Sequence, residues 1–162
     1  MSDDAVDDAE TLFRCVAGDP DKGQWAVDEN GVRRVSSAAF QDPHFKPSVD
    51  RANRCNNDPL WTRRGERDGV ARLAATGIRA IEPALVSDLD EKGHVKQERK
   101  VDVVPDAVEL DVERGVRANP AHAVIVTTPQ ITKNNKAWGR VRVALARVAT
   151  DGGWATVPTS AE

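Results

Sequence analysis

The spacing of hydrophobic and polar residues predicts a chain built mainly from strands. The densest run of β-branched and small apolar residues spans 123–128 and is bounded by prolines, which is typical of a buried strand with defined ends. A shorter β-forming run at 11–17 stops at Gly-Asp-Pro and indicates a first strand ended by a turn. Asn30-Gly31 lies between two β-forming segments, so we predict a hairpin over 24–37.

Two segments allow either a helix or a strand. Apolar residues recur at helical spacing over 68–81 with arginines on the other side, which predicts an amphipathic helix. Thr76-Gly77 in its middle leaves an alternative, namely a strand from Val70, a turn and a short helical turn. Over 137–149 an apolar face, an arginine stripe and four alanines favour a helix, although the same residues also alternate and a last strand could follow at 154–157.

The remaining segments are more polar. Valine and leucine alternate with acids over 101–112, on both sides of a proline, which indicates one or two half-exposed strands. Residues 41–59 contain three prolines and three asparagines without a period, so we predict a long, partly ordered loop that carries binding surface. The acidic segment 1–10 and the small polar segment 158–162 are expected to be flexible, which leaves one domain over 11–157.

Together these elements predict an α+β fold. We expect a mostly antiparallel sheet that includes the strand segments at 11–17, 24–37, 101–112 and 123–128, with one or two helices packed on one face. A chain of 162 residues can bury enough surface to form one hydrophobic core without disulfide bonds or bound metal ions. Because it has three phenylalanines, one methionine and no tyrosine, that core must be built from Val, Ala, Leu and Ile.

Charge and composition restrict the classes of partner. The 23 basic and 26 acidic residues give a net charge of -3, which removes the general electrostatic reason to expect nucleic-acid binding. The longest apolar runs fall far below the roughly 20 residues of a membrane span, and no export signal is visible. We therefore expect a cytoplasmic protein in which Cys15 and Cys55 are free thiols.

One segment has part of a calcium-loop pattern. Asp88 and Asp90 stand at its first and third positions and Gly93 at its sixth. However, Lys92 occupies a ligand position and Arg99 stands where the bidentate acid is needed, so two cations would face the ion. We predict no metal site.

The histidines are the clearest single candidates for binding. His122 lies at the start of the predicted 123–128 strand, just after an Asn-Pro turn signal. Its polar ring is therefore expected at the end of the sheet where that strand begins. His44 lies in the polar 41–59 segment, where loop residues often bind partners.

Three charged or hydroxyl side chains occur in an order that resembles ADP-ribosyltransferases of the Arg-Ser-Glu type. Arg14 lies on the first predicted strand, Ser37 on a second and Glu113 on a later one. The resemblance implies an NAD cofactor whose phosphates Arg14 holds and whose nicotinamide ribose Ser37 orients, with Glu113 stabilising an oxocarbenium-like transition state. Asp111 stands where those families usually have Glu or Gln, and the Ser-Thr-Ser run is reduced to Ser-Ser.

A looser pattern covers most of the chain. It consists of Leu12-Phe-Arg14, Ser36-Ser-Ala-Ala-Phe40, Ser48-Val-Asp50 and Asn119-Pro-Ala-His122-Ala. This pattern resembles a family of small uncharacterised bacterial proteins, some of them among mobile or defence-type genes. The resemblance implies a recurrent fold without a known activity, and it marks Arg14, Ser37, Phe40 and His122 as the first positions to test.

The leading hypothesis from the sequence is a small protein-binding or accessory module of a bacterial conflict or defence system, without catalytic activity or cofactor. It is motivated by the missing catalytic motifs, the long polar segment 41–59 and four tryptophans that are costly to expose without a protein partner. The alternative is an NAD-dependent, ADP-ribosyltransferase-like enzyme.

Overall fold

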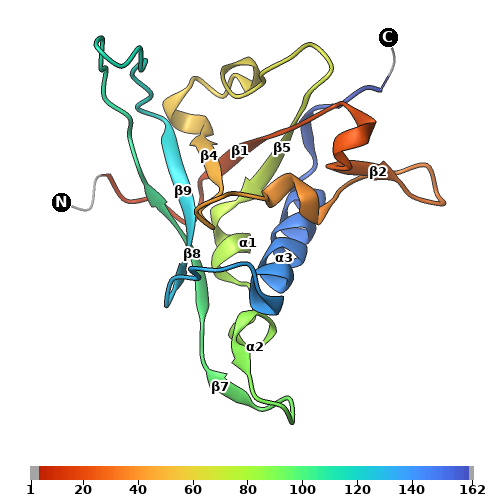
Figure 1. Ribbon diagram of the computed structural model, residues 1–162. Helices are drawn as coiled ribbons and strands as arrows, with labels where there is room; N and C mark the ends of the chain where they lie inside the picture. The colour runs from red at the N-terminus through yellow and green to blue at the C-terminus, as the bar shows by residue number, and fades with distance from the viewer. Residues whose placement is uncertain (1–3, 161–162) are drawn as a thin grey trace.

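The computed structural model describes residues 4–160, which form a six-stranded antiparallel sheet, two short hairpins and three α-helices (Figure 1). The strands of the main sheet, in spatial order, are β10 (Trp154–Thr156), β5 (Gly69–Ala74), β1 (Thr11–Val16), β4 (Ser48–Arg51), β9 (His122–Thr128) and β8 (Lys100–Pro105). The hairpins pair β2 (Trp25–Val27) with β3 (Arg33–Val35) and β6 (Asp88–Leu89) with β7 (Val95–Gln97). The helices are α1 (Ala75–Arg79), α2 (Pro83–Val86) and α3 (Lys136–Gly152), and the 3-10 turns are η2 (Pro20–Lys22), η3 (Ser37–Phe40), η4 (Ala52–Arg54) and η5 (Pro59–Trp61). The predicted α+β class with an antiparallel sheet is confirmed.

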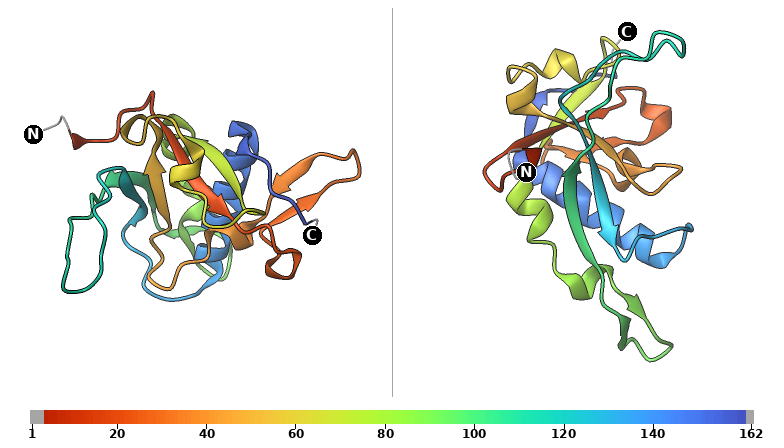
Figure 2. Two further views of the ribbon diagram at one scale, coloured as in Figure 1. Left: turned by 90° about the horizontal axis from the view of Figure 1, so that it is seen from above. Right: turned by 90° about the vertical axis from the view of Figure 1, so that its left-hand side faces the viewer.

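The three α-helices contribute to one hydrophobic core on one face of the sheet (Figure 2). Ile78 of α1, Val86 of α2 and Leu145 of α3 are fully buried there, together with inward-facing strand residues such as Leu12. A smaller cluster around Phe13 covers the other face. The sheet is therefore buried on both faces, most deeply beneath α3.

The helix predicted over 137–149 is confirmed as the middle of α3. Asn135 caps its first turn, since the Asn135 side-chain oxygen accepts from the Trp138 backbone N–H at 2.9 Å. Trp138 is 1% exposed and meets the Phe45 ring edge to face, with the ring centres 5.4 Å apart. The chain then turns at Gly153 into β10, so the last strand forms as well as the helix.

The helix predicted over 68–81 is wrong, and its alternative is right in its strand and short helix, although Thr76-Gly77 lies within that helix and not in a turn before it. Residues 69–74 form β5, which pairs with β1 on one side and β10 on the other, and α1 follows directly. Sheet pairing on both sides outweighs the helical spacing of the apolar residues. Gly77 serves the packing of α1 on α3, because a Cβ at Gly77 would lie 3.0 Å from a methyl group of Val148.

The loop predicted over 41–59 is wrong at its centre. Residues 48–51 form β4, which lies inside the main sheet between β1 and β9. The spacing of hydrophobic residues did not predict this strand, because two of its buried residues, Asp50 and Arg51, are charged. Hydrogen bonds to other side chains make their burial possible.

The strand region predicted over 101–112 is right only in its first half. β8 ends at Pro105, and residues 106–121 leave the main sheet as a long loop at the upper left of Figure 1. Isolated bridges join the two arms of this loop. Leu110 and Val112 alternate as a strand would, but they are 64% and 79% exposed because no second layer covers them.

The predicted 24–37 hairpin is confirmed as β2 and β3, but its expected place in the main sheet is wrong, because the two strands form a separate sheet. Residues near both ends of the described chain contact the domain. Val6 and Glu10 of the acidic N-terminal segment are buried, and so is Pro158. The predicted flexibility of 1–10 and 158–162 stays a prediction, and residues 1–3 and 161–162 lie outside the described part of the chain.

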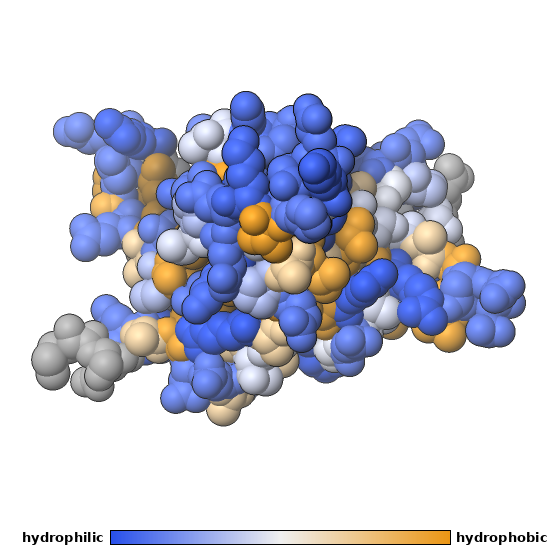
Figure 3. Space-filling view, turned by 90° about the horizontal axis from the view of Figure 1, so that it is seen from below, coloured by the Kyte–Doolittle hydropathy of each residue, from blue (hydrophilic) through white to orange (hydrophobic). Residues whose placement is uncertain are grey.

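The surface on the side of the β6–β7 hairpin is mainly hydrophilic, with separate hydrophobic patches (Figure 3). Within residues 4–160, no helix combines the length and the apolar composition needed to cross a membrane.

Candidate functional site

The main sheet opens between its two central strands. β1 and β4 are neighbours, but they pair only at Leu12 with Arg51 and at Phe13 with Asp50. The remaining residues of each strand are not paired with the other strand, and a cavity of about 610 Å³ lies against these ends. Its walls are mostly polar. They comprise Arg14, Cys15, Ala17, Asp19, Lys22, Gln24, Ser48, Val49, Asp50, Trp61, Thr62, Arg63, Arg64, Asp68, Asn119 and His122.

Arg14 crosses the opening and is half-buried. Its Nε and Nη2 donate to the Ala39 carbonyl at 3.0 and 2.8 Å, and its Nη1 donates to the Ser48 carbonyl at 2.7 Å. The guanidinium carbon lies 5.6 Å from the centre of the Phe40 ring, at cation–π distance. Burial, and after it the positive charge of Arg64, lower the pKa of Arg14 to about 10. The protein therefore holds this positive charge at a cost.

The two fully buried arginines of residues 4–160, Arg51 and Arg99, each have a carboxylate partner, whereas half-buried Arg140 donates only to the Leu85 and Ser87 carbonyls. Arg51 donates to the Glu10 carboxylate at 2.8 Å, and Arg99 donates to Asp88 at 2.9 and 3.0 Å. Arg14 forms no ion pair within residues 4–160, and both of its hydrogen-bonding partners are neutral carbonyl groups. Its positive charge is therefore not neutralised by an ion pair within the described part of the chain.

Asp50 lies on the β9 side of the cavity and binds only neutral groups. It accepts from the Thr62 hydroxyl at 2.8 Å and from the Asn119 amide at 3.0 Å. The Asn119 oxygen in turn accepts from the Trp61 ring N–H at 3.2 Å and the Ala121 backbone N–H at 3.1 Å. These bonds fix the positions of the carboxylate and the amide without using a cation.

Asp68 is likewise bound to neutral donors. It accepts from the Gly18 backbone N–H at 2.9 Å and from the Cys15 thiol at 3.7 Å. Burial raises the pKa of the Cys15 thiol, which keeps it protonated near neutral pH and so removes it as a nucleophile.

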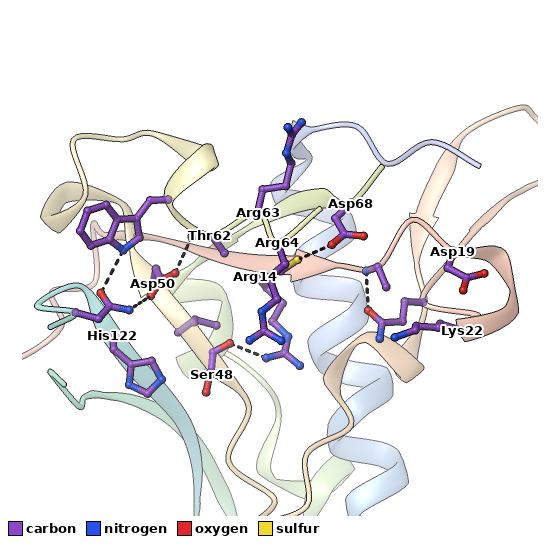
Figure 4. Close-up of a pocket in the computed structure, with 16 residues that line it drawn as sticks. Arg14, Asp19, Lys22, Ser48, Asp50, Thr62, Arg63, Arg64, Asp68 and His122 are labelled. Carbon is purple, nitrogen blue, oxygen red and sulfur yellow. Dashed lines mark hydrogen bonds between the residues drawn. The ribbon is translucent and has the colours of Figure 1, made fainter. Parts of the chain in front are cut away.

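Four cations therefore line the cavity without a bound acid. Arg14, Lys22, Arg63 and Arg64 form no ion pair with any described residue, while the aspartates of the cavity are bound to uncharged groups. Figure 4 shows Arg14 and Arg64 directed into the same part of the cavity, whereas Arg63 points away from it. Arg14 and Arg64 are the side chains best placed to hold an anion.

His122 lines the cavity from the start of β9. Its Nδ1 lies 2.8 Å from the Asp106 carbonyl oxygen and 3.2 Å from the Asp106 carboxylate. A carbonyl oxygen can only accept, so Nδ1 carries the proton and donates. Nε2 has no hydrogen-bond partner in the described part of the chain and is free for a ligand.

The structure does not bring Arg14, Ser37 and Glu113 together. Ser37 lies in η3 and lines a separate shallow pocket beside α3, and Glu113 is exposed on the 106–121 loop. The ADP-ribosyltransferase hypothesis stays a prediction, and NAD consumption by the purified protein is its measurement.

The remaining candidates take different positions. Phe40 is fully buried beneath Arg14, so it supports that side chain and cannot itself contact a partner. His44 is exposed outside the cavity, and its backbone N–H donates to the Asp42 carboxylate at 2.9 Å. Of the binding candidates predicted from the sequence, His122 alone lines the cavity.

Sequence reasoning did not assign a role to several residues of the cavity. Ser48, Asp50 and Asn119 occur in the looser pattern quoted above, which contained the only signal for them. Thr62 and Arg64 lie in a segment without a recognisable motif. The pattern segments come together in space because β1, β4 and β9 are neighbours in the sheet.

Residues 4–160 contain no cluster of three or more side chains that could hold a metal ion. Comparison of the chain with protein-family profiles, with curated proteins and with solved structures finds no match in any of the three.

Proposed function

We propose that this protein is a binding module that takes an anionic ligand into the cavity between β1 and β4. The observation that carries the proposal is the half-buried guanidinium of Arg14, which has no carboxylate partner and lies close to Arg64. Buried charges in proteins are normally paired. An anion bound here would supply the missing partner.

The geometry favours a phosphate-type anion. Three of the five N–H donors of Arg14 are used on carbonyl groups, which leaves two for a ligand. Arginine N–H groups bind phosphate and carboxylate oxygens, and two neighbouring guanidinium groups suit an anion that carries more than one negative charge. The cavity volume of about 610 Å³ lies within the usual range for small-ligand sites.

Titration calorimetry with inorganic pyrophosphate tests this function. We expect saturable binding to the wild type and a loss of affinity of about tenfold or more in Arg14→Gln, because each charge-assisted hydrogen bond contributes roughly 1.5 kcal/mol or more. Arg147→Gln is the matched control, since Arg147 is exposed on α3 and does not line the cavity. Equal affinities for all three proteins, or no binding to the wild type, would contradict the proposal.

A second candidate function is protein binding through the 106–121 loop, in line with the leading hypothesis from the sequence. It is favoured by Leu110 and Val112, whose apolar side chains are 64% and 79% exposed on a protruding loop. A stoichiometric protein recovered with the wild type and lost with a Leu110→Ser and Val112→Ser double variant would support it. Recovery that does not change with the double variant would exclude this loop as the contact.

A further inference from the structure

The cavity has two chemically different sides (Figure 4). Arg14 and Arg64 provide positive charge at its centre, while Asp50, Asn119 and His122 gather on the β9 side, where neither lysine nor arginine contributes. A ligand that spans the centre and the β9 side must therefore carry its negative charge at one end and uncharged polar groups at the other.

The β9 side repels a second anionic group and accepts hydrogen bonds. The Asp50 carboxylate is held by Thr62 and Asn119, but each of its oxygens has a further lone pair for a ligand donor. Because this carboxylate is buried and fixed, a second phosphate or carboxylate beside it would meet strong repulsion. A ligand hydroxyl would instead donate to it.

The same side also offers groups that bind the oxygen of a hydroxyl. One amide hydrogen of Asn119 is used on Asp50, so the second remains available. His122 Nε2 has no partner among residues 4–160, and it accepts when the ring is neutral and donates when the ring is charged. Hydroxyl groups, which both donate and accept, fit this mixed set better than a purely accepting or purely donating group.

We propose that the ligand is a phosphorylated sugar whose phosphate binds Arg14 and Arg64 and whose hydroxyl groups bind Asp50, Asn119 and His122. This inference rests on the anion site proposed above and assigns a chemical class to its ligand. The phosphorylated sugar is either a free sugar phosphate or the ribose phosphate of a nucleotide. Trp61 lies at this side and is 48% exposed, so its ring face is available to a base in the second case.

The test compares ligands of equal charge that differ in hydroxyl groups. Ribose 5-phosphate and methyl phosphate are titrated into the wild type and into Asp50→Asn. Adenosine monophosphate is titrated as well, to test whether the ligand is a nucleotide. We expect ribose 5-phosphate to bind at least about tenfold more tightly than methyl phosphate, because each hydroxyl adds hydrogen bonds. Asp50→Asn should weaken ribose 5-phosphate and strengthen methyl phosphate, since it removes an acceptor of hydroxyl groups and also a negative charge.

Opposite changes for the two ligands cannot come from a general loss of the site. If methyl phosphate and ribose 5-phosphate bind equally and Asp50→Asn strengthens both, the sugar inference is wrong while the anion site stands. If neither phosphate nor pyrophosphate binds the wild type, the anion site itself fails. Tighter binding of adenosine monophosphate than of ribose 5-phosphate would assign the ligand to nucleotides.

A second variant covers the case in which Asp50→Asn does not fold. His122→Phe removes Nε2 from a half-buried ring, and the circular dichroism spectrum reports on its fold. We expect it to weaken ribose 5-phosphate severalfold and to leave methyl phosphate unchanged. An equal effect on both ligands would contradict a role of His122 in binding the sugar.

Discussion

Arg14 carries a positive charge in a half-buried position and donates only to neutral carbonyl groups. Burial lowers its pKa from the ordinary arginine value to about 10, which corresponds to a cost of about 3 kcal/mol for keeping the side chain charged in the folded protein. Three hydrogen bonds to the Ala39 and Ser48 carbonyls offset part of this cost. A side chain placed in this way contributes little net stability, which is expected where a residue serves a ligand.

Replacing Arg14 should therefore change stability less than replacing a paired arginine. We expect Arg14→Met to change the free energy of unfolding by less than about 2 kcal/mol, because the lost hydrogen bonds and the relieved burial of charge nearly cancel. Arg51→Met should lower it by about 3–5 kcal/mol, because Glu10 would remain buried without its partner. Urea unfolding of both variants measures the difference, and equal losses would contradict this account of Arg14.

The Glu10–Arg51 pair also makes stability depend on pH. The hydrogen bond from Arg51 lowers the pKa of Glu10 below its usual 4.5, so its contribution is present above that value and is lost as pH falls through the folded-state pKa. We expect the wild type to lose stability on acidification below pH 4.5 and Glu10→Gln to lose less over the same range. Urea unfolding measured from about pH 7 down to about pH 3 tests this. Parallel curves for the two proteins would exclude Glu10 as a contributor.

Two glycines of α3, Gly139 and Gly152, differ sharply in their surroundings. A Cβ at Gly152 would lie 2.0 Å from the carbonyl oxygen of Arg72 in β5, whereas at Gly139 the nearest atom would be the Arg142 guanidinium at 3.9 Å. Gly152 thus allows the end of α3 to approach the sheet closely.

The two alanine variants should change stability in opposite directions. Gly152→Ala should lower the free energy of unfolding by about 1–3 kcal/mol, because backbone must move to admit the methyl group. Gly139→Ala should raise it by about 0.5–1 kcal/mol through helix propensity alone. Thermal and urea unfolding of the pair measures both effects. A neutral Gly152→Ala would show that the helix end and β5 are less closely packed than described.

The same elements show what the sequence could and could not predict. The strand at 123–128 and the helix at 137–149 follow from their apolar residues, because each buries an apolar face, whereas the hairpin at 24–37 follows from its Asn-Gly turn. β4 does not, since Asp50 and Arg51 are buried through partners far away in the chain. The segment that forms β5 predicted a helix instead, because its apolar residues match the spacing of a helix as well as that of a strand.

For the whole molecule, the candidate site depends on long-range contacts that no local pattern contains. His122 and Arg14 were predicted as candidates, but the cavity forms only because β1 and β4 separate beyond Phe13 and Asp50. The missing carboxylate partner of Arg14 is visible only once all of its neighbours are placed. Sequence reasoning could name some of these residues, and the fold was needed to show that they face one cavity.

Anion binding at Arg14 and Arg64 can be observed directly by NMR of the arginine side chains. The Nε–H of Arg14 donates to the Ala39 carbonyl, so its exchange with water should be slow enough for a resolved signal. On titration with inorganic pyrophosphate we predict saturable shifts of the Arg14 and Arg64 signals with one common midpoint, while the signal of Arg147 on α3 stays unchanged. An unchanged Arg14 signal, or equal weak shifts at all exposed arginines, would contradict the account.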